Sequence, residues 1–211
     1  NILMTYVLLQ FSLEFAQISA CDMVITPNRR ISAWLNRQLD LHNVQSHDVG
    51  GVWQSINILP LSTWLDNLFD ESRDNLAANV QWLDLPIAKT LSSLVLSTTQ
   101  ERAVWEQVIK RQGKDWIKPD GAAKQAQQAW SLLNRWAEVE DLSRWDVNDN
   151  THLFQGWLED FKQTCHQNGW VSQVESLSAI KTCIDQGILK VKGTLFFYGF
   201  DELEPAVKRI V

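Results

Sequence analysis

The fold is indicated by Met23-Val-Ile-Thr-Pro-Asn-Arg-Arg-Ile-Ser-Ala-Trp-Leu-Asn-Arg-Gln-Leu-Asp-Leu41. Its first four residues are apolar and rich in β-branched side chains, which favours a strand, and Pro27-Asn28 then breaks the chain. From Ile31 onward, apolar residues recur at helical spacing. The stretch therefore predicts a strand over 23–26, a tight turn and a helix.

A turn of this kind is a common ligand site in α/β proteins, because the positive end of the helix attracts phosphate. A nucleoside triphosphatase places glycines and a Gly-Lys-Ser/Thr at such a turn. This chain has Pro27-Asn28-Arg29-Arg30 instead, and Pro27 lacks an N–H donor. We therefore expect no ATP hydrolysis, no tight ATP binding and no cofactor.

Strand signals recur at the two ends of the sequence. Ser55–Pro60 predicts a second strand, and Thr63-x-x-Asp66 has the form of a capping box for the helix after it. Gly193–Phe200 is a continuous apolar run, as expected for a central strand covered on both faces. These units predict a three-layer, parallel α/β core made from about 22–70 and 193–211.

The region between them, about 86–187, lacks strand signals and predicts helices. Thr98-x-x-Glu101 and Ser172-x-x-Glu175 are expected to cap two of these helices, and Gly169 and Gly187 to end two. The expected helical stripes contain Leu91, Leu94 and Val95; Val104, Trp105, Val108 and Ile109; Ala122, Ala126, Ala129, Trp130, Leu133, Trp136 and Ala137; Leu153, Phe154, Trp157, Leu158, Phe161 and Cys165; and Val174, Leu177, Ile180 and Ile184.

Residues 1–12 are expected to form a poorly ordered leader, followed by a helix over 13–19. The apolar run at 2–9 has no Lys or Arg near it, and polar residues interrupt the segment that follows. A secretory signal peptide would need a basic start and an unbroken apolar region. We therefore do not predict secretion.

The composition is that of a globular chain: 211 residues, 45% hydrophobic and 21% charged, with a net charge of −6. The acidic balance argues against a surface that coats nucleic acid, so any nucleic-acid contact should be a local patch. Cys21, Cys165 and Cys183 form no Cys-x-x-Cys pair, which favours a reducing compartment such as the cytoplasm. No metal site is expected, and we interpret the cysteines as small buried side chains.

The chain contains eleven tryptophans, an unusually high number. Many occur within helical patterns, where we expect them to pack between helices. One or two exposed tryptophans could instead stack on nucleic-acid bases. The helical set is Trp34, Trp64, Trp105, Trp130, Trp136 and Trp157.

Three sequence words carry a family resemblance: Val24-Ile-Thr-Pro-Asn-Arg-Arg-Ile31, Gln100-Glu-x-x-x-Trp-Glu106 and Tyr198-Gly-Phe-Asp-Glu-Leu-Glu-Pro205. Together with the layout, they resemble the amino-terminal part of bacterial probable DNA repair proteins, which are relatives of the AddB/RexB-type subunit of helicase-nuclease complexes. The resemblance implies a helicase-like body that has lost its Walker A motif, an inactive P-loop, and a PD-(D/E)XK nuclease outside this chain.

The same resemblance implies a domain layout. Residues 13–85 would form the first half of a helicase-like 1A domain, and 86–190 would form a helical insertion called 1B. Residues 191–211 would supply the return strand and the start of a helix of 1A.

The resemblance also implies site residues. Asn28, Arg29 and Arg30 become candidates for DNA contact, although both arginines could simply pair with Asp201 and Glu202. Those two acids stand where a helicase keeps the Asp-Glu pair that holds magnesium. Without a phosphate cradle they form a degenerate Walker B-like pair, and we favour a solvated turn. No catalytic residue is expected in this chain.

Three functions follow as alternatives. The first is a non-catalytic helicase-like domain of DNA repair and recombination that positions DNA, weakly and without sequence preference, or partner subunits for the nuclease. The second is a helical scaffold for protein interaction, which the acidic balance favours. The third is an unconventional ATPase that would use Asp201 and Glu202.

Overall fold

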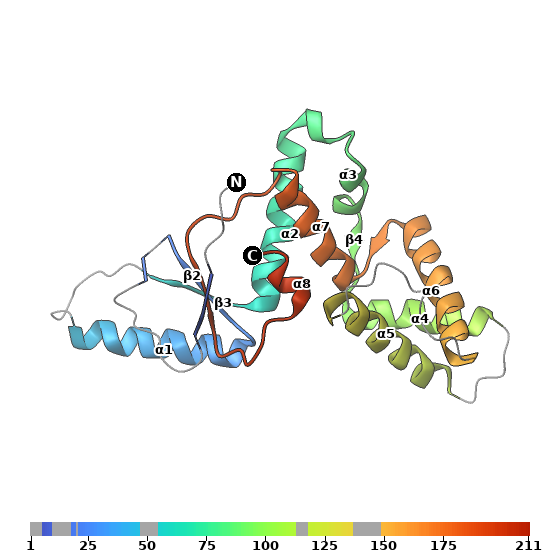
Figure 1. Ribbon diagram of the computed structural model, residues 1–211, viewed down its shortest axis with the longest axis horizontal. Coiled ribbons are helices and arrows are strands. Elements are labelled where there is room, and N and C mark those ends of the chain that lie inside the picture. The colour runs from blue at the N-terminus through green and yellow to red at the C-terminus, as the bar shows by residue number, and fades with distance from the viewer. Residues whose placement is uncertain (1–5, 10–17, 20, 47–54, 113–117, 137–148) are drawn as a thin grey trace. The chain divides into compact units, whose positions relative to one another are not determined.

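The computed structural model describes residues 6–9, 18–19, 21–46, 55–112, 118–136 and 149–211 (Figure 1). The chain divides into two compact units. The sheet unit comprises 1–71, 189–203 and Val211, and the helical unit comprises 72–188 and 204–210.

The sheet unit contains a four-stranded sheet in the order β1-β6-β2-β3, and all its neighbouring strands are parallel. In that order the strands are Tyr6–Leu9, Leu195–Tyr198, Met23–Thr26 and Asn57–Pro60. The prediction that the 23–26 strand and the 195–200 segment share one parallel sheet is confirmed, and the α/β class with it.

The two faces of this sheet are covered by different helices. Phe196 and Tyr198 pack with the buried cluster that includes Leu35 of α1 (Arg29–Ser46). Phe197 makes an edge-to-face contact with Trp64 of α2 (Leu61–Ala78), with ring centroids 6.0 Å apart. Because successive strand residues point to opposite faces, the sheet lies between α1 and the first part of α2. The expected three layers are therefore present.

The central pairing of β2 with β6 is fixed where the two strands begin. The Met23 N–H donates to the carbonyl of Thr194 at 3.0 Å, and the Asp22 carboxylate accepts the Thr194 N–H at 2.8 Å. This hydrogen bond lowers the pKa of Asp22 below its ordinary value. Gly193 has φ of +78°, and a Cβ there would lie 2.0 Å from the carbonyl oxygen of Cys21. Only glycine fits this approach.

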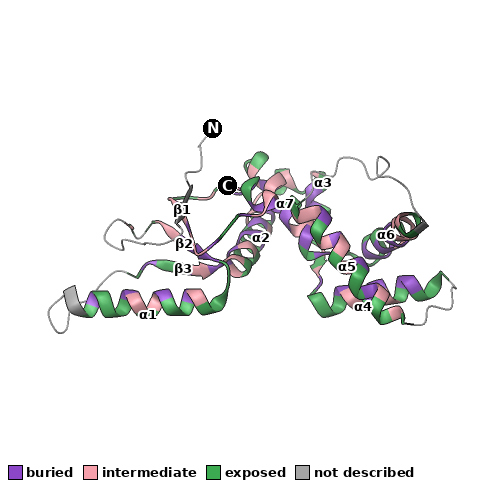
Figure 2. Cartoon of the chain, turned by 60° about the horizontal axis from the view of Figure 1, so that its bottom comes forward, coloured by how far each residue is buried: buried purple, intermediate pink, exposed green. Residues whose placement is uncertain are grey.

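The helical unit is built around helices from separate parts of the sequence (Figure 2). In its core, Trp105 is fully buried and stacks on Phe161, with ring centroids 4.0 Å apart and planes at 3°. Trp130 donates its indole N–H to Ser172 at 3.3 Å. After α2, its elements are η2 (Val80–Trp82), α3 (Pro86–Leu91), β4 (Leu94–Val95), α4 (Thr98–Arg111), α5 (Pro119–Trp136), α6 (Asp149–Asn168), β5 (Trp170–Val171), α7 (Gln173–Asp185) and α8 (Pro205–Lys208).

One of the three predicted capping boxes is confirmed. Ser172 and Glu175 cap α7 reciprocally. The box predicted at Thr98 is wrong by one residue, because Ser97 caps α4 with Gln100 and leaves Glu101 to point inward. The box predicted at Thr63 is wrong as well, since α2 already begins at Leu61, directly after β3.

The helix stops are confirmed. Gly169 follows the end of α6 with φ of +64°, and Gly187 follows α7 with φ of +73°. A residue with positive φ commonly ends a helix, and glycine adopts this conformation without a steric clash because it has no Cβ.

Two other expectations need correction, and a third is mostly untested. Part of the predicted leader, Tyr6–Leu9, forms strand β1 beside β6. The insertion is not purely helical, because Leu94–Val95 pairs with Trp170–Val171 in a two-stranded parallel sheet. Most of the helix predicted over 13–19 lies outside the described residues.

The unit boundaries also differ from the predicted domain boundaries. The first division falls inside α2, between Glu71 and Ser72, rather than after residue 85. The segment 204–210 belongs to the helical unit, although it was expected to continue the sheet domain. The buried side chains of Ala206 and Val207 and an ion pair between Glu204 and Arg135 of α5 explain this placement.

The tryptophans and cysteines follow the predictions in part. Trp64, Trp105, Trp130 and Trp157 are buried, whereas Trp34 and Trp136 are 50% and 45% exposed.

Cys165 and Cys183 are buried as expected, but Cys21 is exposed. Burial raises the pKa of Cys165 to about 12 and that of Cys183 above its ordinary value. Both buried thiols therefore stay protonated at neutral pH.

No described helix combines the length and the apolar character that a bilayer crossing requires.

Candidate functional site

The first candidate site lies where the parallel strands of the sheet unit end. Because β2 and β6 run in the same direction, the turn after Thr26 and the turn after Tyr198 emerge at one edge of the sheet. A Cβ placed on Gly199 would lie 3.8 Å from Cδ of Pro27 and 3.4 Å from Cδ1 of Ile31, so the turn after β6 lies against the turn after β2 and the start of α1. The structure thus brings the predicted DNA-contact residues, Asn28 to Arg30, and the acidic pair Asp201 and Glu202 to the same edge of the sheet.

The turn after β2 is held by its own polar side chains. The hydroxyls of Thr26 and Ser32 form a buried hydrogen bond of 2.6 Å. The side-chain oxygen of Asn28 accepts the N–H groups of Arg30 and Ile31, at 3.0 and 3.1 Å. Asn28 is therefore the N-cap of α1, and the amide groups that would have met a phosphate are already occupied.

Arg29 and Arg30 are the first two residues of α1, and both are exposed. Loss of hydration and the neighbouring Asp70 raise the pKa of Asp66, and Arg29 acts in the opposite direction. Arg29 therefore lies near a carboxylate of α2.

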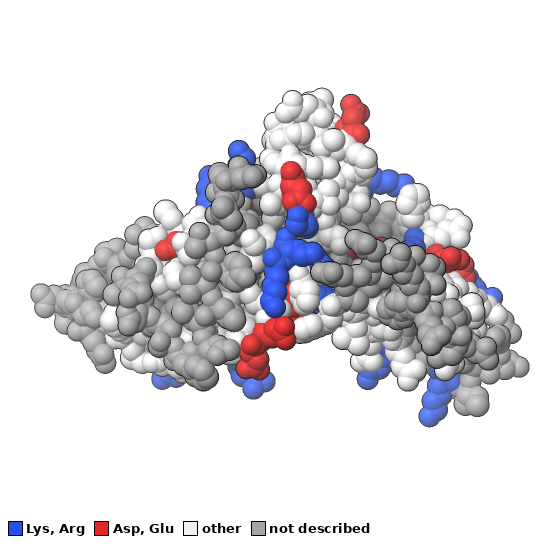
Figure 3. All heavy atoms as spheres, viewed as in Figure 1, with Lys and Arg blue, Asp and Glu red and all other residues white. Residues whose placement is uncertain are grey.

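Asp201 and Glu202 lie exposed in the bend that follows β6. Within the described ranges, no three His, Cys, Asp or Glu side chains are grouped so that they could hold a metal ion. On the face drawn in Figure 3, the Lys and Arg side chains of described residues lie among Asp and Glu side chains. At this edge of the sheet, the exposed arginines at the start of α1 are Arg29 and Arg30.

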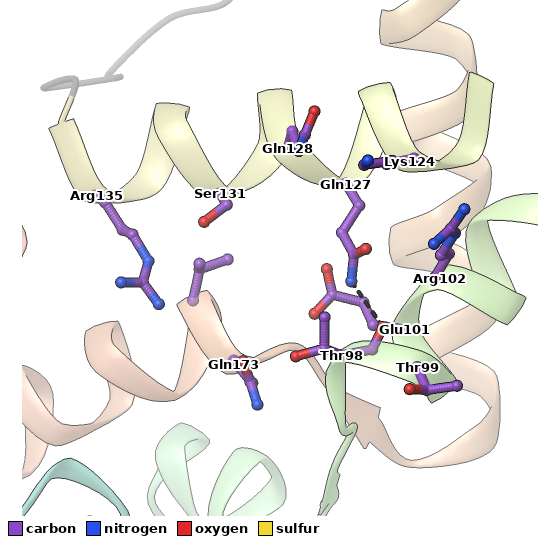
Figure 4. Close-up of a pocket in the computed structure, with 11 residues that line it drawn as sticks. Thr98, Thr99, Glu101, Arg102, Lys124, Gln127, Gln128, Ser131, Arg135 and Gln173 are labelled. Atoms are coloured by element: carbon purple, nitrogen blue, oxygen red, sulfur yellow. Dashed lines mark hydrogen bonds between the residues drawn. The ribbon is translucent and has the colours of Figure 1, made fainter. Parts of the chain in front are cut away.

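A second candidate, which sequence reasoning missed, is a polar pocket of about 430 Å³ in the helical unit (Figure 4). Side chains of α5, among them Gln127 and Arg135, face the first turns of α4 and α7 across it. Gln127 donates to the Thr98 carbonyl at 2.9 Å. The pocket brings together segments distant in sequence, so no local pattern could have revealed it. Its lining is Thr98, Thr99, Glu101, Arg102, Lys124, Gln127, Gln128, Ser131, Arg135, Gln173 and Val174.

Glu101 is the most unusual residue in this pocket, because it is charged in type and yet only 5% exposed. Burial raises the pKa of Glu101, and hydrogen bonding by the Gln173 backbone N–H and the Gln127 side chain opposes this effect in part. Glu175 adds to the rise through its negative charge. The two arginines of the lining are already engaged, Arg102 with Asp120 at 2.5 Å and Arg135 with Glu204 at 3.1 Å.

We expect Glu101→Gln to stabilise the chain at neutral pH. A carboxyl with a raised pKa binds its proton more tightly in the folded chain, so its contribution to stability falls as pH rises through the ordinary value of 4.5 and the higher folded pKa. The variant should therefore melt above the wild type at pH 7, and the gap should narrow below pH 4.5. Thermal unfolding followed by circular dichroism measures both.

Glu159→Gln, at an exposed position of α6, is the matched control and should show no such pH-dependent gap. Equal destabilisation by Glu101→Gln at both pH values would contradict the prediction. It would mean that the hydrogen bonds of the carboxylate outweigh the cost of burying its charge.

The comparison with models of known protein families returned no match, and no curated protein matches the chain in sequence.

Proposed function

We propose that this chain forms part of a non-catalytic, helicase-like domain of a cytoplasmic DNA-repair protein, which positions DNA or partner subunits for a nuclease located outside the chain. The observation that supports it most is the parallel pairing of β2 with β6. This pairing puts the arginine turn and the Asp201-Glu202 turn at one sheet edge, and a helical unit is inserted between the two strands.

The lack of catalysis is supported by the chemistry of the turn after β2. Pro27 has no N–H, and Asn28 already occupies the N–H groups of Arg30 and Ile31. The turn also lacks the lysine that a P-loop directs at the phosphates. The turn therefore offers a magnesium-nucleotide complex neither a set of free backbone N–H groups for the phosphates nor a lysine. Without a bound nucleotide, Asp201 and Glu202 have no catalytic role.

DNA contact is supported by the two exposed arginines at the positive end of α1. Guanidinium groups at a helix N-terminus make charge-assisted contacts with phosphate, and such contacts position a strand without reading its bases. Binding should therefore be weak, sensitive to salt and indifferent to sequence.

The double variant Arg29→Ala with Arg30→Ala should weaken binding of an oligonucleotide. Each lost phosphate contact lowers the slope of log K against log salt by about 0.7 to 0.9, so the slope should fall by at most about two. Fluorescence anisotropy over a salt series measures this, with circular dichroism to show that folding is intact. An unchanged slope would remove both arginines from the DNA path.

A scaffold for protein interaction is the second candidate, because α5 exposes the large apolar side chains of Leu132 and Trp136. Exposed apolar side chains that lie together can mark a site of protein contact. On this alternative, the double arginine variant should leave oligonucleotide binding unaffected, while Leu132→Asp should abolish association with a partner subunit.

A further inference from the structure

The outer face of α1 carries a stripe of cationic and apolar side chains that begins at Arg30 and continues beyond the first turn of the helix. Arg30, Trp34, Arg37, Leu41 and Val44 are all exposed. At 3.6 residues per turn they fall within an arc of about 80°. The opposite face of α1 packs on the sheet through buried residues that include Leu35 and Leu39.

Trp34 lies at one edge of this stripe, and its ring contacts the sheet. Its indole stacks against Tyr198, with ring centroids 6.4 Å apart and planes at 17°, yet half of its surface is exposed. Tyr198 is the last residue of β6, so the indole rests on a rigid strand. A ring fixed in this way loses little conformational freedom when a second flat group stacks on it.

The two arginines lie on either side of the indole along the helix. Seven residues separate Arg30 from Arg37, a rise of about 10 Å, which about three stacked nucleotides would span. Asp40, at the edge of the stripe, is the nearest carboxylate on α1 and reduces the positive charge there. Two cations flanking an exposed aromatic ring are complementary to a ligand that alternates phosphates with flat bases.

We infer that this stripe binds single-stranded nucleic acid, with Trp34 stacked on an unpaired base and Arg30 and Arg37 at phosphates. The inference rests on the proposed DNA contact and adds the type of strand and the residue that holds it. A duplex is a poor fit, because its base faces are covered by neighbouring pairs and only an unpaired base can stack on the indole.

The test compares binding of two oligomers of equal length. One consists of deoxythymidine, and the other consists of abasic sites, so that it has the same phosphates but no bases. Trp34→Ala should weaken binding of the thymidine oligomer roughly 10-fold and leave binding of the abasic oligomer unchanged. Trp34→Phe should keep most of the affinity, because a phenyl ring still stacks. Arg37→Ala should weaken both oligomers. Trp136→Ala, at the exposed tryptophan of α5, is the matched control and should change neither.

Each contrary outcome has a definite meaning. If the wild type binds the thymidine oligomer and Trp34→Ala binds it equally well, the stacking inference is overturned while the DNA contact stands. An equal loss on both oligomers would show that Trp34 only supports the fold, and would also overturn it. Failure of the wild type to bind either oligomer would overturn the proposed function. A change in the sedimentation of the free chain by Trp34→Ala, with oligomer binding intact, would make the stripe a protein interface instead.

Discussion

Replacement of Gly193 by alanine is expected to destabilise the sheet unit by about 3 kcal/mol. Roughly 1–2 kcal/mol comes from placing an alanine at positive φ, and the rest from the backbone shift that relieves the overlap with the Cys21 carbonyl. The shift would pull apart the hydrogen bonds of Asp22 and Met23 with Thr194, where the pairing of β2 with β6 begins. Urea unfolding followed by circular dichroism measures the loss.

Gly187→Ala is the matched control for this prediction. Gly187 has a similar φ of +73°, but no atom lies within 4 Å of the position where its Cβ would stand. Gly187→Ala should then lower the stability only by the cost of alanine at positive φ, about 1–2 kcal/mol. Equal effects of the two substitutions would show that residue 193 does not lie against the chain at Cys21, and would put the start of the central strand pair in doubt.

Trp105→Ala is expected to cost the helical unit about 3–5 kcal/mol. The side chain has no exposed surface, and its removal leaves a large cavity and ends the stack with Phe161. Calorimetry should show the transition of the helical unit at a much lower temperature or not at all. Trp105→Phe should keep most of the stability, since it preserves an aromatic ring beside Phe161.

Trp136→Ala is the control for Trp105, because Trp136 is 45% exposed and its loss should change stability by no more than about 0.5 kcal/mol. If Trp105→Ala behaved like Trp136→Ala, α4 would not form the centre of this core.

The fold was predictable wherever one apolar signal was long and unambiguous. The strands at 23–26 and 195–198 are short runs rich in β-branched or aromatic residues, and they pair as expected. Strand β1 was missed, because its apolar run precedes polar residues and its pairing with β6 depends on a partner far along the chain. Strands β4 and β5 are two residues long, too short for any periodicity to show.

Helix boundaries were less predictable, because neighbouring residues can make the same bond. Ser97 and Thr98 are both able to cap α4, and Gln100 and Glu101 are both able to complete the box. The sequence does not decide between them. The structure distinguishes them by burial: Ser97 and Gln100 form the box, and Glu101, one residue further on, is buried.

The candidate site was predictable in position and less so in chemistry. A strand followed by a turn and two arginines correctly placed Arg29 and Arg30 at the start of α1. The capping role of Asn28 and the proximity of Arg29 to Asp66 depend on local geometry and on a second helix. The stripe of Arg30, Trp34 and Arg37 was visible in helical spacing, but Trp34 had been assigned to the core because most tryptophans in helices are buried.

The central claim is that the chain contacts DNA without using ATP, and one measurement tests it most directly. Anisotropy of a labelled single strand is followed from about 50 to 200 mM salt, with and without Mg-ATP. We expect weak binding at low salt, a linear fall of log K with log salt, and the same curve when Mg-ATP is present. No binding at the lowest salt, or binding that requires Mg-ATP, would contradict the claim.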